Sequence, residues 1–171
     1  MRFVALLHAV NLGKARKVNM AQLRALLGTL GLSGVQTYIQ SGNALFDADP
    51  DPELGLKLET ALGAHFGFSI PVTLRTADDW QQTARACPTD LLTEPVTVAF
   101  LTRQPAPDAV AALQARDVRP ERWALVGQQV YQTVPEGTRN LRLSQAVLTR
   151  VLGVPCTARH WRTVQAIAEQ L

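Results

Sequence analysis

The stretch Thr37-Tyr38-Ile39-Gln40-Ser41-Gly42-Asn43-Ala44-Leu45-Phe46 decides how the first half of the chain folds. Its β-branched and aromatic residues predict two short strands that fold back on each other at Ser41-Gly42-Asn43. Gly42 and Asn43 belong to the residue types that most readily accept the positive φ of a tight hairpin turn. With Gln40, they place uncharged hydrogen-bonding groups at one end of the hairpin. Those groups either bind a ligand or simply close the turn.

The segments on either side of this hairpin predict a mixed sheet-and-helix unit. Residues 2–7 form an apolar run typical of a central strand. Asn19 is a good N-cap for a helix over residues 20–30, whose leucines fall on one face. A second helix from Leu54 and a strand over residues 70–75 follow the hairpin. The order β-α-β-β-α-β is that of a split βαβ, ferredoxin-like unit.

The second half repeats this order without a final strand. The predicted elements are a strand over 96–101, a helix over 108–115, strands over 123–126 and 129–134, a helix over 143–152 and a last helix over 160–170. No sequence repeat is apparent between the halves, so the duplication rests on element order alone. The prediction is an α+β protein of two ferredoxin-like (split βαβ) halves, the second incomplete, plus a C-terminal helix. The predicted domains are a first half, a connecting helix with linker, and a second half with the C-terminal helix: 1–76, 77–94 and 95–171.

Composition is that of a folded domain and excludes several classes of protein. Of the 171 residues, 47% are hydrophobic and 18% are charged. No apolar run approaches the roughly 20 residues that span a bilayer, and residues 1–8 lack the length and cleavage site of a signal peptide. We therefore expect a cytoplasmic protein without a membrane partner. Cys87 and Cys156 are isolated and the three histidines are far apart, so neither a metal nor a cofactor is expected.

Charge is unevenly distributed along the chain. Residues 1–52 hold 5 basic and 3 acidic side chains, residues 53–118 hold 5 and 8, and residues 119–171 hold 7 and 3. If the two ends meet in space, they form a basic face suited to an anionic partner. The alternative is a mildly basic surface without a partner.

Cations also crowd two predicted helix starts, where the positive end of the helix dipole disfavours them. They are Lys14, Arg16 and Lys17 before the first helix, and Arg159, His160 and Arg162 at the last. An anion nearby would offset this cost, and it is either an internal carboxylate or a bound phosphate. No established catalytic motif accompanies them. Gly13-Lys14 lacks the remaining residues of a nucleotide P-loop, and Ser41 is not in a nucleophile elbow.

Three segments resemble a known family. They are ALLHAVNLGKARKVNMAQLRALLGTLGLSGVQTYIQSGNALF, GTRNLRLS and GVPCTARHWRTV. They look like the bacterial family called domain of unknown function 1697, and the resemblance spans nearly the whole chain. The TYIQSGN element is specific to it. The resemblance implies an α+β fold of two ferredoxin-like halves and brings no activity with it.

The family pattern falls on residues of three segments. They are Asn11, Gly13, Lys17 and Met20; Tyr38, Ile39, Gln40, Ser41, Gly42 and Asn43; and Thr157, Arg159 and Trp161. The chain departs from the pattern at His8, where the family usually has Arg, at Ala9 and Lys14, usually Gly, and at His160, usually Asn. The resemblance implies that the loop after the first strand, the hairpin and the start of the last helix converge on one polar site.

The leading hypothesis is a cofactor-free protein that binds an anionic ligand, which is a nucleotide, RNA or a phosphorylated metabolite. Cations would neutralise the ligand's charge and amides would orient it. The predicted ligand-binding residues are Lys17, Gln40, Asn43 and Arg159, with Asn11, Tyr38 and Arg139 as second candidates. One alternative is a small enzyme on a phosphorylated or carboxylated metabolite, with His8 or His160 as general base. The other is a protein-interaction module.

Overall fold

The computed structural model describes residues 1–171 and divides them into two compact units. The first unit comprises residues 1–81 together with Leu171, and the second comprises residues 82–170. Each unit contains one four-stranded antiparallel sheet with helices, which confirms the predicted α+β class. None of the helices combines the length and the apolar composition needed to cross a membrane.

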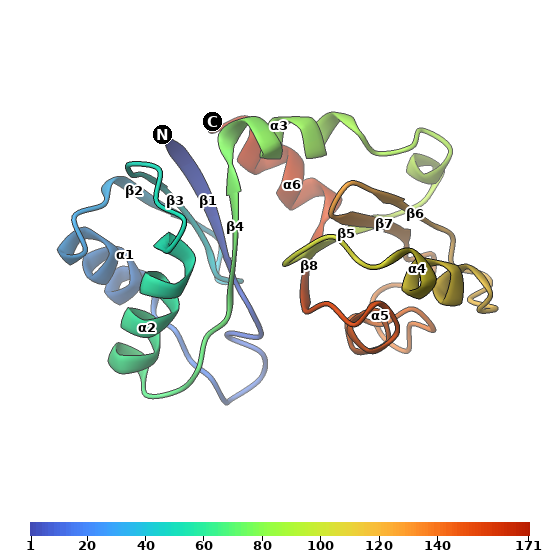
Figure 1. The fold of residues 1–171 in the computed structure, drawn as a ribbon, viewed down its shortest axis with the longest axis horizontal. Helices are drawn as coiled ribbons and strands as arrows, with labels where there is room; N and C mark the ends of the chain where they lie inside the picture. The colour runs from blue at the N-terminus through green and yellow to red at the C-terminus, as the bar shows by residue number, and fades with distance from the viewer. The chain divides into compact units, whose positions relative to one another are not determined.

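The first unit is a complete split βαβ fold. Its elements are β1 (Arg2–Leu7), α1 (Met20–Thr29), β2 (Ser33–Tyr38), β3 (Asn43–Asp47), α2 (Leu54–Phe66) and β4 (Val72–Thr76). The next helix, α3 (Ala77–Arg85), contains the boundary between the two units. The sheet order β2-β3-β1-β4 is that of a ferredoxin-like unit. Figure 1 shows α1 and α2 on the same face of this sheet. The element order predicted from the sequence is confirmed here.

Local sequence explains where the first helix begins and which face it buries. The Asn19 side chain accepts hydrogen bonds from the backbone N–H groups of Ala21 and Gln22, as an N-cap does. Met20, Leu23 and Leu27 are the buried residues of α1. They pack with Phe3, Ala5 and Leu7 of β1 in one hydrophobic core. An apolar core between one face of the sheet and the helices α1 and α2 thus stabilises the first unit.

The β2–β3 turn differs from the prediction in its position. It spans residues 39–42, and its positive φ angles are at Ile39 (51°) and Gly42 (78°). The expectation of positive φ at Asn43 is wrong, because Asn43 is the first residue of β3 and is fully buried. Its side-chain amide donates to Tyr38 O and to Ser41 Oγ, both at 2.9 Å, so it closes the turn from inside.

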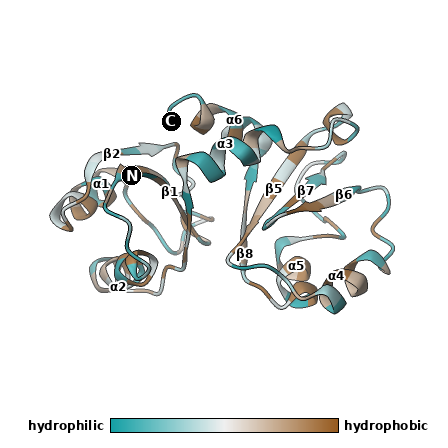
Figure 2. Ribbon diagram, turned by 45° about the horizontal axis from the view of Figure 1, so that its top comes forward, coloured by the Kyte–Doolittle hydropathy of each residue, from teal (hydrophilic) through white to brown (hydrophobic).

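The second unit has one strand more than the sequence predicts. Its elements are the 3₁₀ helix η1 (Leu91–Thr93), β5 (Val96–Leu101), α4 (Pro107–Gln114), β6 (Trp123–Val126), β7 (Gln129–Thr133), α5 (Gln145–Leu152), β8 (Cys156–His160) and α6 (Trp161–Ala168). β8 completes the sheet in the order β6-β7-β5-β8, so the second half is not incomplete. In Figure 2, β5 and β6 of this unit are largely brown, whereas α3 is largely teal. Thr157 and Arg159 interrupt the apolar pattern of β8, which hid it in the sequence.

The two units share equivalent backbone contacts at the end of their first strands. In each unit, a backbone hydrogen bond of 2.9 Å connects the end of the first strand to the hairpin turn. Leu7 N donates to Gly42 O, and Leu101 N donates to Gln128 O. His8 N and Thr102 N donate to the carbonyls of residues 71 and 155, both prolines. The repeat also exists in the sequence, contrary to expectation, because Val-Ala-x-Leu recurs at 4–7 and 98–101, and Pro-x-Thr-x-Arg at 71–75 and 155–159.

The turn of the first unit allows no side chain at Gly42. A Cβ there would lie 2.6 Å from Val10 Cγ2 and 2.9 Å from Leu7 Cβ, whereas a Cβ at Gly13 would meet nothing within 4 Å. Both glycines have positive φ. We predict that Gly13→Ala lowers the free energy of unfolding by about 1–2 kcal/mol, from backbone strain alone. Gly42→Ala should cost about 1–3 kcal/mol more, because the methyl group overpacks the turn.

Urea unfolding of the two variants measures the difference. Replacing glycine by alanine also lowers the conformational entropy of the unfolded chain, which stabilises the folded protein. This effect is the same for both variants and cancels when their unfolding free energies are compared. Equal unfolding free energies for Gly42→Ala and Gly13→Ala would show that the turn does not press on β1.

Candidate functional site

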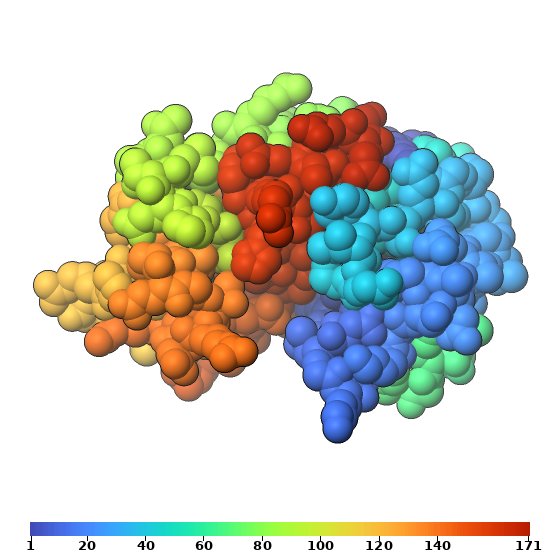
Figure 3. All heavy atoms as spheres, turned by 180° about the vertical axis from the view of Figure 1, so that it is seen from behind, coloured from blue at the N-terminus to red at the C-terminus, as the bar shows by residue number.

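An exposed loop follows β1 and projects from the first unit. Val10 and Val18 are buried and anchor its two ends, while Leu12, Lys14 and Lys17 between them are exposed. Figure 3 shows this segment in blue as a projection, with the cyan turn between β2 and β3 beside it. We define residues 11–17 as the β1–α1 loop. The buried valines on either side fix its two ends, and most of the residues between them are exposed to solvent.

Asn11 joins this loop to the β2–β3 turn. Its Nδ2 donates to Val18 O at 2.9 Å and to Gln40 O at 2.7 Å, and its Oδ1 accepts from Val18 N at 2.9 Å. Its backbone N–H donates to Arg16 O at 3.0 Å. Its φ of 55° lies in the left-handed region that asparagine tolerates better than most residues. Asn11 therefore connects the loop to the β2–β3 turn, and its side-chain amide is hydrogen-bonded to backbone groups of the protein.

Arg16 braces the other side of the loop. Its guanidinium donates to Ala9 O and to Ser69 O, both at 2.8 Å, and lies over the Phe68 ring at 4.8 Å from the ring centre. A guanidinium committed to two carbonyls and a ring face is a structural support. Of the loop's cations, Lys14 and Lys17 are the two that are exposed.

Cations dominate this part of the first unit. Residues 1–46 contain five Lys and Arg side chains and no Asp or Glu. Lys14, Lys17 and Arg24 form no ion pair with a carboxylate. Lys17 Nζ donates to Gly13 O within the loop, and Arg24 donates to Thr37 Oγ1 at 2.6 Å, which ties α1 to the end of β2.

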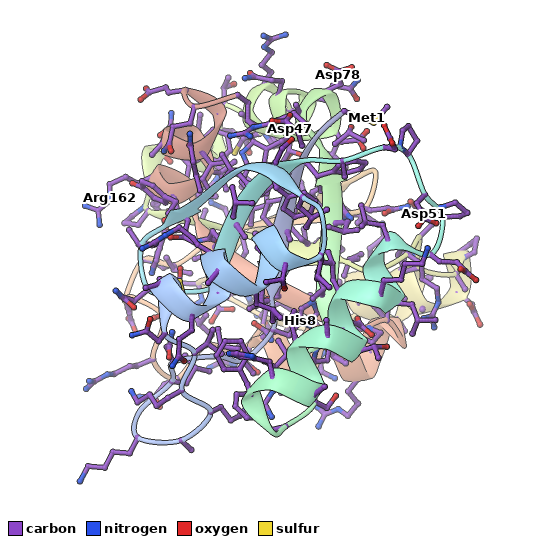
Figure 4. All side chains as sticks on the ribbon, turned by 90° about the vertical axis from the view of Figure 1, so that its left-hand side faces the viewer. Met1, His8, Asp47, Asp51, Asp78 and Arg162 are labelled. Carbon is purple, nitrogen blue, oxygen red and sulfur yellow. The ribbon has the colours of Figure 1, made fainter.

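The nearest carboxylates in sequence lie elsewhere on the unit. Figure 4 shows Asp47 and Asp51 far from the projecting loop, with His8 near the loop's base. Asp47 pairs with Arg2 at 3.0 Å, and Asp51 pairs with Lys57. Both carboxylates are thus paired with cations that lie outside the loop. The β1–α1 loop, the first turns of α1 and the β2–β3 turn thus form one basic surface.

The predicted ligand residues of the first unit fall into two groups. Gln40 and Lys17 are exposed on the basic surface, and Tyr38 is half-buried beside the turn. Asn11 and Asn43 lie underneath it, with amide groups that donate to protein atoms. The structure thus brings Asn11, Gln40 and Asn43 together, and two of these three hold the turn in place.

The two predicted ligand residues of the second unit differ in burial. Arg159 is 7% exposed on β8, and it donates to Thr157 Oγ1 and Ala158 O, both at 2.8 Å. Burial lowers the pKa of its guanidinium to about 10. It lies within β8 rather than at the start of the last helix. Arg139 is exposed on the loop between β7 and α5.

The two histidines considered as general bases also differ. His8 is 6% exposed, and its Nε2 lies 2.8 Å from Thr73 Oγ1 on the adjacent strand. His160 is exposed at the N-cap of α6 and makes no side-chain capping bond. No group of three His, Cys, Asp or Glu side chains could hold a metal ion. Burial raises the pKa of both cysteine thiols, which disfavours the reactive thiolate.

The predicted set omits Lys14 and Arg24, which the structure places on the basic surface. Counting charge over residues 1–52 concealed them, because three aspartates between 47 and 51 offset the cations in the sum. The useful signal is the unbroken run of 46 residues without a carboxylate. The exposed apolar side chains of Leu12 and Ile39, 70% and 51% exposed, accompany these cations and were also missed.

Removing the Asn11 amide should release the loop. Asn11→Ala leaves Val18 O, Val18 N and Gln40 O without their partner, and we predict a loss of roughly 2–4 kcal/mol in unfolding free energy. Asn19→Ala, which removes an ordinary helix cap, should cost about 1 kcal/mol. Urea unfolding measures both values. A loss for Asn11→Ala no larger than for Asn19→Ala would contradict the fastening role.

Comparisons with known proteins agree with this architecture. The family described as "Protein of unknown function (DUF1697)" matches residues 1–131. Among solved structures, a conserved bacterial protein from Streptococcus pneumoniae is similar, with 26% sequence identity and a TM-score of 0.77, over 98% of this chain and 97% of that one. No curated protein matches the chain. Since the family match covers most of the sequence and includes the loop and the hairpin, the chain belongs to the DUF1697 family.

Proposed function

We propose that the first unit binds single-stranded nucleic acid, with RNA as the preferred candidate, through its basic surface. The residues that would touch it are Lys14, Lys17, Arg24 and Gln40, with Leu12 and Ile39 at their side. The observation that carries the proposal is the group of three exposed cations without a carboxylate partner, on a segment of 46 residues that has no acidic side chain. Such a group suits a chain of phosphates.

The form of the surface favours a polymer over a small metabolite. Lys14 and Lys17 are exposed on a projecting loop (Figure 3), and Arg24 is exposed on the neighbouring helix α1. Sites for small molecules are concave and enclose most of the ligand. A projecting row of cations instead follows an extended backbone, where each cation can approach a separate phosphate. Neither lysine has a carboxylate partner, and the one bond that Lys17 forms is to the carbonyl of Gly13 in its own loop.

Uncharged groups of the turn complement the cations. Gln40 is exposed and its backbone carbonyl is held by Asn11, so the position of the residue is fixed while its side chain can reach outwards. Leu12 on the loop and Ile39 on the turn expose apolar surface. Their side chains can lie against the faces of unstacked bases, which double-stranded nucleic acid does not offer.

The backbone of this region is strained in a way typical of functional loops. Ala9, Asn11, Arg16 and Ile39 all have φ between 50° and 55°, a conformation that residues other than glycine rarely adopt. A β-branched residue such as Ile39 is especially unfavourable there. Strained residues persist where the surroundings hold them, and they concentrate at binding and catalytic sites. This supports the proposal without identifying the ligand.

Neutralising the two lysines tests the proposal. Fluorescence anisotropy with a short labelled single-stranded RNA should show binding at low salt that weakens as salt increases. In the Lys14→Ala, Lys17→Ala double variant, we predict an affinity at least about tenfold lower. The slope of log affinity against log salt should fall by about 1.4, because each phosphate that a protein neutralises on a single strand contributes roughly 0.7 to it.

A double variant in the second unit is the matched control. Arg116 and Arg150 are exposed and form no ion pair, so Arg116→Ala with Arg150→Ala removes the same charge elsewhere. It should retain the affinity within about twofold and the slope. Equal losses in the two double variants would mean that net charge alone attracts RNA. No binding by the unmodified protein at low salt would overturn the proposal.

A further inference from the structure

The geometry points to a second site, a small pocket in the second unit that takes the phosphate group of a small phosphate ester. The pocket has a volume of about 230 Å³ and lies between the β7–α5 loop (residues 134–144) and the segment before β6. Arg139, Asn140 and Arg142 belong to its lining, as do Glu121 and Glu136. This site goes beyond the nucleic-acid contact proposed for the first unit and does not depend on it.

Glu121 fixes one wall of this pocket. It is 6% exposed, and its carboxylate accepts hydrogen bonds from Arg142 N at 2.6 Å, Leu143 N at 2.7 Å and Gln132 Nε2 at 3.1 Å. Three N–H donors on one buried carboxylate hold the backbone rigidly. Leu143 is also fully buried in the core of the unit. The C-terminal end of the loop is therefore held both by the Glu121 carboxylate and by the packing of the Leu143 side chain.

The other end of the loop is also defined. Gly137 N donates to Val134 O at 2.9 Å, and Gly137 has a φ of 82°. Asn140 has a φ of 59° and is the only non-glycine residue with positive φ in the second unit. Between these turns lies Arg139. The loop therefore presents Arg139 and Arg142 from a backbone held at both ends, which a binding site needs.

The two guanidinium groups are not committed to other protein groups. Neither Arg139 nor Arg142 forms an ion pair, although Glu121 and Glu136 line the same pocket. The Glu121 carboxylate is already occupied by its three N–H donors. Asp117 is paired with Arg119 at 2.7 Å, and this hydrogen bond is the main reason that the pKa of its carboxyl is lowered, with a smaller effect from the charge of Arg142. The arginines thus retain their donors for an external group.

The size and chemistry of the pocket select its ligand. Pockets for drug-sized molecules occupy about 300–1,000 Å³, so 230 Å³ suits one functional group better than a whole nucleotide. The planar fork of arginine matches a phosphate or a carboxylate with two parallel hydrogen bonds. Two arginines together favour the more highly charged phosphate. The amide of Asn140 can donate a further hydrogen bond or accept one from the ester's hydroxyl groups.

An NMR titration with inorganic phosphate tests this site. In ¹H–¹⁵N spectra of the full chain, phosphate should shift the amide signals of residues 136–142 in a saturable way, while acetate at the same concentration and ionic strength should shift them far less. The Arg139→Ala, Arg142→Ala double variant should bind phosphate at least about tenfold more weakly. Both side chains are exposed, so the variant should retain the dispersed spectrum of a folded protein.

Control variants separate this site from the basic surface of the first unit. Arg116→Ala with Arg150→Ala, and Lys14→Ala with Lys17→Ala, should leave the phosphate titration unchanged. The Arg139→Ala, Arg142→Ala variant should retain its affinity for RNA. Phosphate shifts that persist in that variant, that spread over all basic residues, or that acetate reproduces at equal strength would each overturn the site.

Discussion

The contact between the β2–β3 turn and the end of β1 is the constraint on which the first unit depends. Leu7 N donates to Gly42 O at 2.9 Å, and Gly42 lies so close to Val10 and Leu7 that only a glycine fits. This contact fixes where β1 ends. The chain then turns outwards at Ala9, and Asn11 fastens the emerging loop to the carbonyl of Gln40 in the same turn. The exposed lysines thus belong to a loop that these contacts hold in place.

The second unit has the same arrangement of strands and helices, but its longest loop lies at a different position. Its first strand is likewise tied to the turn, through Leu101 N and Gln128 O, but its β5–α4 connection is short, residues 102–106. The long connection lies instead between β7 and α5, residues 134–144, where the first unit has only residues 48–53. Function in repeated folds resides in such loops, because the sheet and helices beneath them tolerate little change. Each unit therefore offers one elaborated loop of its own.

The repeat also explains two buried arginines. Arg75 pairs with Val4 in the register between β4 and β1, and Arg159 pairs with Val98 between β8 and β5. Both are less than 10% exposed, both donate to the carbonyl of the preceding residue, and burial lowers the pKa of each. Matched positions in matched strands indicate a shared structural origin. Arg159 therefore differs from the exposed cations that the proposed sites use.

Sequence patterns predicted most of the fold, because helix caps and apolar periodicity are local. The Asn19 cap, for example, was predicted from the residue type and its place before the leucine pattern of α1. β8 was missed because buried Thr157 and Arg159 look like surface residues in a sequence. The roles of Asn11 and Asn43 could not be predicted either. Both are polar and near a loop, and only tertiary contacts show that their amides bind protein atoms rather than face solvent.

Amide hydrogen exchange with and without saturating single-stranded RNA tests the central claim most directly, because it locates the contact on the unmodified protein. The account predicts slower exchange in peptides covering residues 11–24 and 36–43, with little change in the core strand β5 or in the β7–α5 loop. Protection confined to the second unit, or no protection under conditions where RNA is bound, would contradict it.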